Sequence, residues 1–167
     1  MPSWTVISDS IAWIHGPISA GIGLLTAQNG IYFLDLTDTS LSSPFGGVTQ
    51  SLATTAGQNY NLNFYLGTSK FYNPATGTSA LLSIAGNNFT VSSTTTTLAN
   101  SWELKSVTFT ALGATTVIGF QGIAGQDYIG LDNINVSAVP EPSSIAMLFA
   151  GLAAVGSVVV RKRKQMG

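Results

Sequence analysis

The C-terminal 29 residues constrain what this chain can fold into more than any other stretch. Residues 145–160 are an uninterrupted run of sixteen apolar and small side chains. As a helix with a rise of about 1.5 Å per residue, the run is about 24 Å long, against a hydrocarbon core of about 30 Å. Two serines before it bring the length to about 27 Å. We therefore predict a transmembrane helix over residues 143–160, preceded by a separate domain over residues 1–138.

The flanks of this run support the same prediction. Pro140 and Pro142 prevent a helix from continuing out of the preceding strand, so the helix begins at Ser143 or Ser144. Four consecutive cations follow the run: Arg161, Lys162, Arg163 and Lys164. By the positive-inside rule they lie in the cytoplasm, which places the domain on the other side of the membrane. The alternative is a buried core helix, but such a helix would show a polar face and would not end in a block of charges.

A short motif, Val139, Pro140, Glu141 and Pro142, precedes the apolar run, and the basic end follows it. This order resembles the PEP-CTERM sorting signal of bacteria, here within residues 139–167. The resemblance implies that an exosortase, an integral-membrane cysteine protease, recognises and processes the tail. It also implies inner-membrane anchoring through the C-terminal helix before processing, then delivery to the cell surface or an exopolysaccharide matrix. In that reaction the chain is the substrate.

Charge is scarce in the domain itself. Only 8% of the residues in the chain are charged, against about 25% in an average protein. Residues 1–139 hold six acids and two lysines, a net charge of −4. Because such a domain cannot neutralise a row of phosphates, we expect no nucleic-acid partner. The chain has no cysteine, which excludes disulfides, thiol nucleophiles and thiolate metal sites.

The pattern of the domain predicts β-structure throughout. Short runs rich in β-branched and aromatic residues are separated by Gly, Asn, Asp and Pro, without helical periodicity before the tail. In residues 59–66, apolar side chains alternate with asparagines and a tyrosine, which predicts a half-buried strand. The predicted strands are 4–8, 11–14, 31–36, 48–53, 59–66, 79–85, 89–92, 102–111, 117–122 and 128–137. So many short strands in one domain predict an all-β, two-sheet sandwich of the jelly-roll type.

Three motifs within these strands carry a second resemblance: Phe33-Leu34-Asp35-Leu36, Tyr60-x-Leu62-x-Phe64 and Gly130-Leu131-Asp132-Asn133-Ile134. They are similar to motifs of the DUF642-like and choice-of-anchor families of secreted proteins. The resemblance implies a galactose-binding-like jelly roll, related in shape to many carbohydrate-binding modules. Members usually begin with a strand carrying an Asn-Gly-x-Phe-Glu motif. That motif and a signal peptide are both absent here, so we expect the true start to lie upstream of Met1.

The sequence offers little for catalysis. His15 is the single histidine, and it stands beside a Gly-Pro turn, so we expect it to be structural or exposed. A glycosidase needs two carboxyl groups about 5 to 10 Å apart, and no motif nominates such a pair among the six acids. We therefore expect a protein that is not an enzyme.

Two kinds of binding site are plausible from the residue types. Structural calcium takes carboxylate and amide oxygens, which Asp132, Asn133 and Asp35 would supply. In the alternative, Asp132 and Asn133 satisfy backbone groups at a turn or sheet edge. No other cofactor is predicted.

A sugar site would combine an aromatic platform with amides that bond to hydroxyl groups. Tyr65 and Tyr72, with Asn63 and Asn73, are the candidates, and Tyr128 is a further aromatic near a loop. We expect the three tryptophans, Trp4, Trp13 and Trp102, to pack in the core. The leading hypothesis is a non-enzymatic surface or matrix protein, and the alternative is a module that binds an extracellular polysaccharide.

Overall fold

The computed structural model describes residues 3–8, 11–20, 23–38, 45–68, 77–93, 101–125 and 128–140. Within these residues the structure contains twelve β-strands and no helix. The strands are β1 (Thr5–Ser8), β2 (Ala12–His15), β3 (Ile18–Ala20), β4 (Gly23–Leu25), β5 (Tyr32–Asp35), β6 (Gly46–Ala53), β7 (Asn59–Thr68), β8 (Thr78–Ile84), β9 (Asn87–Ser93), β10 (Ser101–Thr110), β11 (Thr115–Ala124) and β12 (Gly130–Ala138). Two compact units divide the chain, Met1–Ser137 and Ala138–Gly167. The sandwich described below is the first of them.

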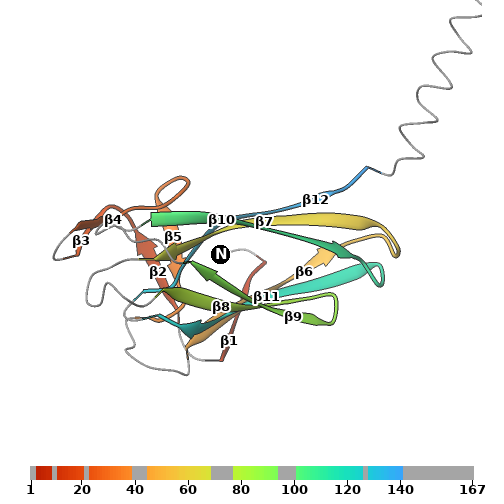
Figure 1. Cartoon of the computed structure of the whole chain (residues 1–167), viewed down its shortest axis with the longest axis horizontal. Helices are drawn as coiled ribbons and strands as arrows, with labels where there is room; N and C mark the ends of the chain where they lie inside the picture. Colours follow the sequence, from red (N-terminus) through yellow and green to blue (C-terminus); the bar gives the residue numbers. More distant parts are fainter. Residues whose placement is uncertain are drawn as a thin grey trace, which may run out of the picture. The chain divides into compact units, whose positions relative to one another are not determined.

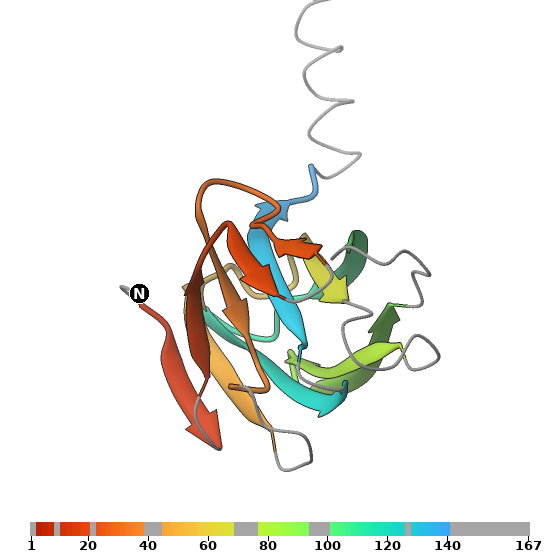
Figure 2. The same cartoon turned by 90° about the vertical axis from the view of Figure 1, so that its left-hand side faces the viewer.

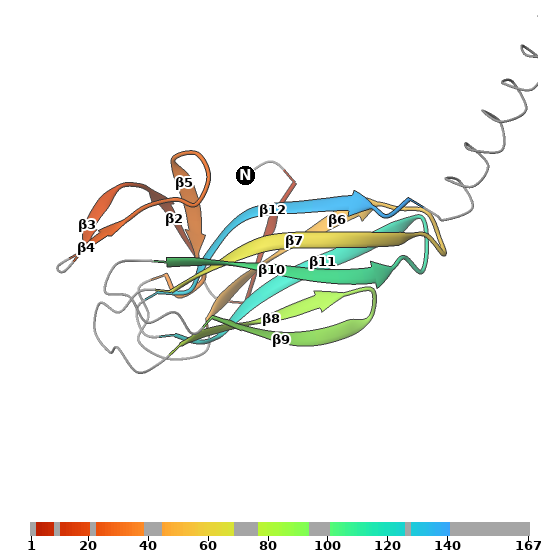
Figure 3. The same ribbon diagram turned by 45° about the horizontal axis from the view of Figure 1, so that its top comes forward.

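Ten of the strands form two five-stranded sheets. Sheet A has the order β1-β6-β11-β8-β9, and sheet B has the order β10-β7-β12-β5-β2. Figure 1 shows the sheets as two layers, and Figure 3 shows β10, β7 and β12 of sheet B side by side. β1 lies at one margin of the domain (Figure 2), where sheet A ends. The predicted two-sheet β-sandwich is confirmed.

Alternation along β7 builds the core between the sheets. Leu62, Phe64 and Leu66 are completely buried. Phe64 meets Phe120 of β11 across the core, with ring centroids 4.8 Å apart. Burying each such side chain contributes about 1.5–3 kcal/mol to stability, so this strand joins the two sheets firmly. The alternation predicted for residues 59–66 is confirmed.

The strands predicted at residues 79–85 and 89–92 pair as a hairpin, with a shorter turn than the gap between them. Ile84 pairs with Asn87, so only Ala85 and Gly86 form the loop. Both have positive φ, 48° and 77°, as a two-residue hairpin turn of the type I′ class requires. Asn87 and Asn88, which lie between the two predicted strands, are already part of β9. The register of β8 with β9, which residue composition does not reveal, sets the position of this turn.

The small hairpin of β3 and β4 was not predicted. Its ladder consists of three residue pairs, Ile18 to Ala20 against Gly23 to Leu25. Three residues are too few to display an alternating pattern, and the preceding Gly-Pro turn indicated a loop. The hairpin leads into residues 26–29, which contact the outer face of sheet B through hydrogen bonds described below.

A second aromatic cluster lies on the outer face of sheet B, away from the core between the sheets. The rings of Phe33, Trp102 and Tyr128 meet edge to face, with centroids 5.6 to 6.3 Å apart. They pack over two glycines, because a Cβ on Gly67 or Gly130 would come within 2.9 Å of these rings. Trp102 is therefore partly buried as expected, but in this cluster and not in the main core.

Two aromatic assignments from the sequence are wrong. Trp13 was expected in the core but is 49% exposed, because β2 is the edge strand of sheet B and little covers it. Tyr128 was a candidate for a binding surface but is buried in the outer aromatic cluster. Trp4 packs against the core and contacts Phe120, as expected.

The predicted transmembrane helix at 143–160 lies outside the described residues. Among the residues that the structure does describe, no helix has the length and apolar character needed to cross a membrane. The division into a domain over 1–138 and a sorting signal over 139–167 stays a prediction.

The outer aromatic cluster yields a stability prediction. In Gly67→Ala the new Cβ would lie 2.7 Å from the ring of Trp102 and 2.7 Å from the hydroxyl of Tyr128. We expect a loss of about 1–3 kcal/mol in the free energy of unfolding, because the rings have to move. Urea unfolding followed by tryptophan fluorescence measures it. The control is Gly113→Ala, whose Cβ would come no closer than 3.9 Å to any neighbour. Equal stability of the two variants would contradict this packing.

Candidate functional site on the outer face of sheet B

The outer face of sheet B displays a continuous row of uncharged polar side chains. On β7 these are Asn59, Asn61, Asn63 and Tyr65, which alternate with the buried leucines and Phe64. The register pairs them, in that order, with Thr110, Thr108, Ser106 and Leu104 of β10. Paired residues of neighbouring strands share one face of a sheet. We call these eight residues the amide face.

Hydrogen bonds between the two strands hold the amide face in place. The hydroxyl of Ser106 donates to Oδ1 of Asn61 at 2.9 Å, and that of Thr110 donates to Oδ1 of Asn59 at 2.7 Å. A longer contact of 3.5 Å joins Nδ2 of Asn61 to Oδ1 of Asn63. A carboxamide has two donor hydrogens and two acceptor lone pairs. These carboxamides are therefore oriented and still have capacity for a ligand.

One end of the amide face is bounded by residues 26–29. The indole N–H of Trp102 donates to the carbonyl oxygen of Thr26 at 3.0 Å. The Asp132 carboxylate accepts hydrogen bonds from the backbone N–H groups of Gln28 and Asn29, at 2.8 and 3.0 Å. These bonds fasten the segment onto sheet B, and we call it the wall. Trp102 pairs with Gly67, and two residues along the same ladder Leu104 pairs with Tyr65. The Tyr65–Leu104 pair is therefore the part of the amide face nearest to the wall.

Asp132 and Asn133 have structural contacts within this wall. Oδ1 of Asp132 also accepts from the backbone N–H of Asn133, at 2.7 Å. The Asn133 side chain donates to Oε1 of Gln28 at 2.9 Å. Asn133 has a positive φ of 48°, which asparagine tolerates better than most residues. The arrangement matches the alternative stated above, in which these side chains satisfy backbone and amide groups.

Asp35, the last residue of β5 in the same sheet, is buried and also bonds to its neighbours. Its Oδ1 accepts from the backbone N–H of Ile129 at 2.9 Å and of Thr37 at 3.0 Å. The Thr37 hydroxyl lies within 3.0 Å of both carboxylate oxygens. Burial raises the pKa of the Asp35 carboxyl, although these hydrogen bonds act in the opposite direction. Asp35 therefore joins the end of β5 to the start of β12.

The calcium site stays a prediction. Among the described residues, no group of three or more His, Cys, Asp or Glu side chains is placed to hold a metal ion. Asp35 and Asp132 each use their oxygens on N–H and O–H donors, as described above. Any calcium would therefore have to compete with these hydrogen bonds.

Only part of the predicted site lies in the described residues. Tyr65 and Asn63 are both on the amide face. Tyr72 and Asn73 lie outside the described residues, as do Glu141, Pro142 and the basic residues 161–164. Val139 and Pro140 are described and exposed. The contribution of β10 was missed, because alternation shows that its Leu104 and Ser106 face outward but does not show which strand lies beside them.

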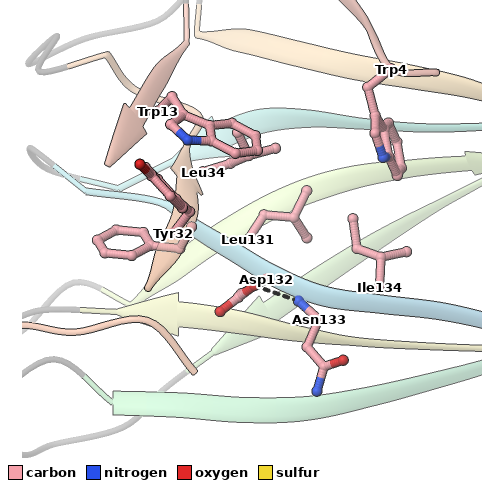
Figure 4. Close-up of a pocket in the computed structure, with 9 residues that line it drawn as sticks. Trp4, Trp13, Tyr32, Leu34, Leu131, Asp132, Asn133 and Ile134 are labelled. Atoms are coloured by element: carbon pink, nitrogen blue, oxygen red, sulfur yellow. Dashed lines mark hydrogen bonds between the residues drawn. The ribbon is translucent and has the colours of Figure 1, made fainter. Parts of the chain in front are cut away.

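The structure also contains an apolar groove of about 170 Å³ at the β2 side of the domain. Trp4 and Trp13 lie on either side of it, with Leu34, Leu131 and Ile134 between them (Figure 4). The ring of Tyr32 lies against that of Trp13 at a tilt of 39°, with centroids 5.5 Å apart. The Asn133 carboxamide points away from both tryptophans. Asp132 and Asn133 also line the groove, so its surface is mostly, but not wholly, apolar.

Comparison with known proteins assigns the sequence of this domain to a family. The family described as a protein of unknown function, DUF642, matches residues 1–136. The chain belongs to the DUF642 family. A PEP-CTERM protein-sorting motif matches residues 138–164, at the position expected for the sorting signal. The motif indicates an exported protein of the cell envelope. No curated protein matches this member of the family.

Solved structures share the fold of this DUF642 domain. A family 35 carbohydrate-binding module from an environmental isolate matches 80% of this chain and 90% of its own, at 16% identity and TM-score 0.51. The enzymatically active domain of tailspike protein 4 from bacteriophage CBA120 matches 83% of this chain, at 13% identity and TM-score 0.52. This chain spans about a fifth of that structure, 20%.

A third match is a Clostridium thermocellum endo-1,4-β-D-xylanase structure with a carbohydrate-binding module, complexed with xylohexaose. It covers 83% of this chain and 26% of its own, at 11% identity and TM-score 0.52. At such identities these three likenesses concern the fold alone.

The raised pKa of Asp35 yields a prediction of pH dependence. Its carboxyl holds a proton in the folded state at pH values where the unfolded chain, with a pKa of about 3.8, has released it. The contribution of Asp35 to the free energy of unfolding therefore falls as pH rises from its unfolded pKa to its folded pKa, and is then constant. Asp35→Asn keeps one acceptor oxygen and cannot titrate. We expect the stability difference between wild type and variant to fall over this window.

Urea unfolding of both proteins, in nonionic detergent at several pH values, measures this difference. Carboxyl ¹³C NMR provides a direct second readout, with a midpoint expected above the ordinary value for aspartate of about 3.9. A difference independent of pH, or an NMR midpoint below that value, would refute the burial argument.

Proposed function

We propose that this DUF642 protein is a non-enzymatic component of the cell surface or of an exopolysaccharide matrix, exported and then processed through its tail. The single observation that carries the proposal is the PEP-CTERM motif at residues 138–164, directly after the sandwich. A transmembrane helix over 143–160 would hold the protein in the inner membrane until an exosortase processes it near Pro140, Glu141 and Pro142. The basic residues 161–164 would keep the end of the chain in the cytoplasm.

The surroundings of the ionisable side chains support a role without catalysis. His15 is exposed and meets the ring of Tyr32 edge to face. Glu103 pairs with Lys105 on the same strand. Asp35 and Asp132 are occupied by backbone N–H groups. General acid–base catalysis needs a side chain placed to exchange a proton with a substrate. The contacts of these five side chains do not bring any two of them together as an acid and a base facing a common substrate.

Polysaccharide recognition by the sandwich is the second candidate. The observation that favours it is the amide face, where Tyr65 and Asn63 lie among oriented carboxamide and hydroxyl groups. Two of the solved structures with this fold contain carbohydrate-binding modules, one in a complex with xylohexaose. Carbohydrate binding would retain the protein in the matrix after its tail is removed.

The sorting proposal predicts the fate of two single variants in a host that carries an exosortase. In Glu141→Ala the acid of the sorting motif is lost, so we expect the full-length chain to accumulate in the membrane fraction. In Glu103→Ala the acid removed belongs to the sandwich, and we expect processing as in wild type. Immunoblots of membrane, surface and medium fractions distinguish processed from full-length protein. Equal processing of Glu141→Ala and wild type would contradict the assigned role of the motif.

A further inference from the structure

The amide face combines features that together specify a class of ligand. It carries hydrogen-bonding side chains on two adjacent strands, a partly apolar pair at one end, and no charged residue among its eight members. We propose that the amide face binds a neutral polysaccharide, with Tyr65 and Leu104 under a sugar ring and the asparagines along the chain. The inference rests on the polysaccharide-binding candidate above and names its ligand class and site.

The charge pattern selects a neutral ligand. The ion pair of Glu103 and Lys105 belongs to the opposite side of β10, because these residues pair with the buried Leu66 and Phe64. Asp132, at the wall, already accepts three N–H bonds. An acidic polysaccharide would thus find no cation on the amide face and would meet a domain of net charge −4. A neutral chain avoids this repulsion.

The polar groups match the hydroxyl groups of a sugar. Each hydroxyl is both donor and acceptor, and carboxamides and hydroxyls offer both functions. The Ser106–Asn61 and Thr110–Asn59 bonds orient the amides before any ligand arrives. Orientation in advance lowers the entropy cost of binding, which is otherwise large for long polar side chains.

The apolar pair provides the surface against which a sugar ring can pack. Leu104 is 54% exposed although it is a large aliphatic residue, and Tyr65 pairs with it on the next strand. Tyrosine combines an apolar ring with a hydroxyl group, which suits the mixed surface of a pyranose. On β10, the next outward-facing residue after Leu104 is Trp102, which bonds to Thr26 of the wall. A ring placed on Tyr65 and Leu104 would therefore rest beside the wall.

The length of the amide face favours a polymer over a single sugar. From Tyr65 to Asn59 is six residues of strand, about 20 Å at roughly 3.4 Å per residue. A ligand that follows β7 can therefore contact the asparagines in succession. The apolar groove beside Trp13 offers fewer free hydrogen-bonding groups, because Asp132 and Asn133 in its lining already bond to residues 28 and 29, so it suits a polysaccharide less well.

Affinity electrophoresis and isothermal titration of the full chain in nonionic detergent test the proposal. The panel contains neutral polymers (xylan, mixed-linkage β-glucan, galactan and mannan) and acidic ones (alginate and polygalacturonate). We expect saturable binding to at least one neutral polymer, weaker binding to its short oligosaccharides, and a Kd that changes less than about twofold between low and high salt. Binding confined to the acidic polymers would overturn the proposal.

Variants place the site. Tyr65→Ala should raise the Kd at least about tenfold, the usual scale for losing a stacked aromatic contact. Asn63→Ala should raise it by a smaller factor. The matched controls, Val117→Ala and Asn88→Ala, remove exposed residues from strands β11 and β9 of sheet A and should leave the Kd unchanged. Circular dichroism and urea unfolding confirm that each variant is folded.

Three further outcomes would each overturn the inference. Binding that survives in a Tyr65→Ala/Asn63→Ala double variant means that the ligand lies elsewhere. Binding lost in Trp13→Ala but kept in Tyr65→Ala places the ligand in the apolar groove. Failure to bind any polymer, with normal processing of the tail, would refute the proposed ligand and binding site. The proposed surface or matrix role would be unaffected.

Discussion

Period-two alternation along β7 is the constraint on which the rest of the domain depends. Its leucines and Phe64 must face sheet A, because exposing them would forfeit about 1.5–3 kcal/mol for each side chain. A shift of one residue in the ladder would exchange the two faces of the strand, so the core fixes the register with β10. The amide face is the other side of this same register. Core packing thus determines which asparagines stand together and which hydroxyls they meet.

Contacts between distant parts of the chain give the amide face its boundary. Asp132 bonds to Gln28 across 104 positions, and Trp102 bonds to Thr26 across 76. The bond from Gln28 to Asp132 is partly buried, and a buried carboxylate that lost such a partner would cost about 1–3 kcal/mol. Together with the exposed Trp102 bond, it holds residues 26–29 on the sheet. The glycines beneath the outer aromatic cluster allow Trp102 to lie close enough for its bond. Packing and polar contacts at this end therefore support one another.

The tail and the sandwich are governed by different physics. Four of the six cations in the chain lie after the apolar run, and the domain keeps a net charge of −4. The sorting motif is defined by the linear order of a short Pro-Glu-Pro sequence, an apolar run and a basic end. The sandwich depends on pairing between residues far apart in the chain, as the order of strands in its two sheets shows. This difference explains why the tail was recognisable from residues alone, and why the β10 half of the amide face was not.

By itself, the sequence determined the class of the fold, the location of most strands and the inward and outward positions on β7. These properties follow from local alternation and from residue composition, which act over a few neighbouring positions. The tertiary structure alone decided that Trp13 is exposed at an edge, that Tyr128 is buried, and that Asp132 fastens residues 28 and 29. It also decided that Ser106 meets Asn61. Strand order and register set those outcomes, and both arise from contacts between residues that local pattern does not connect.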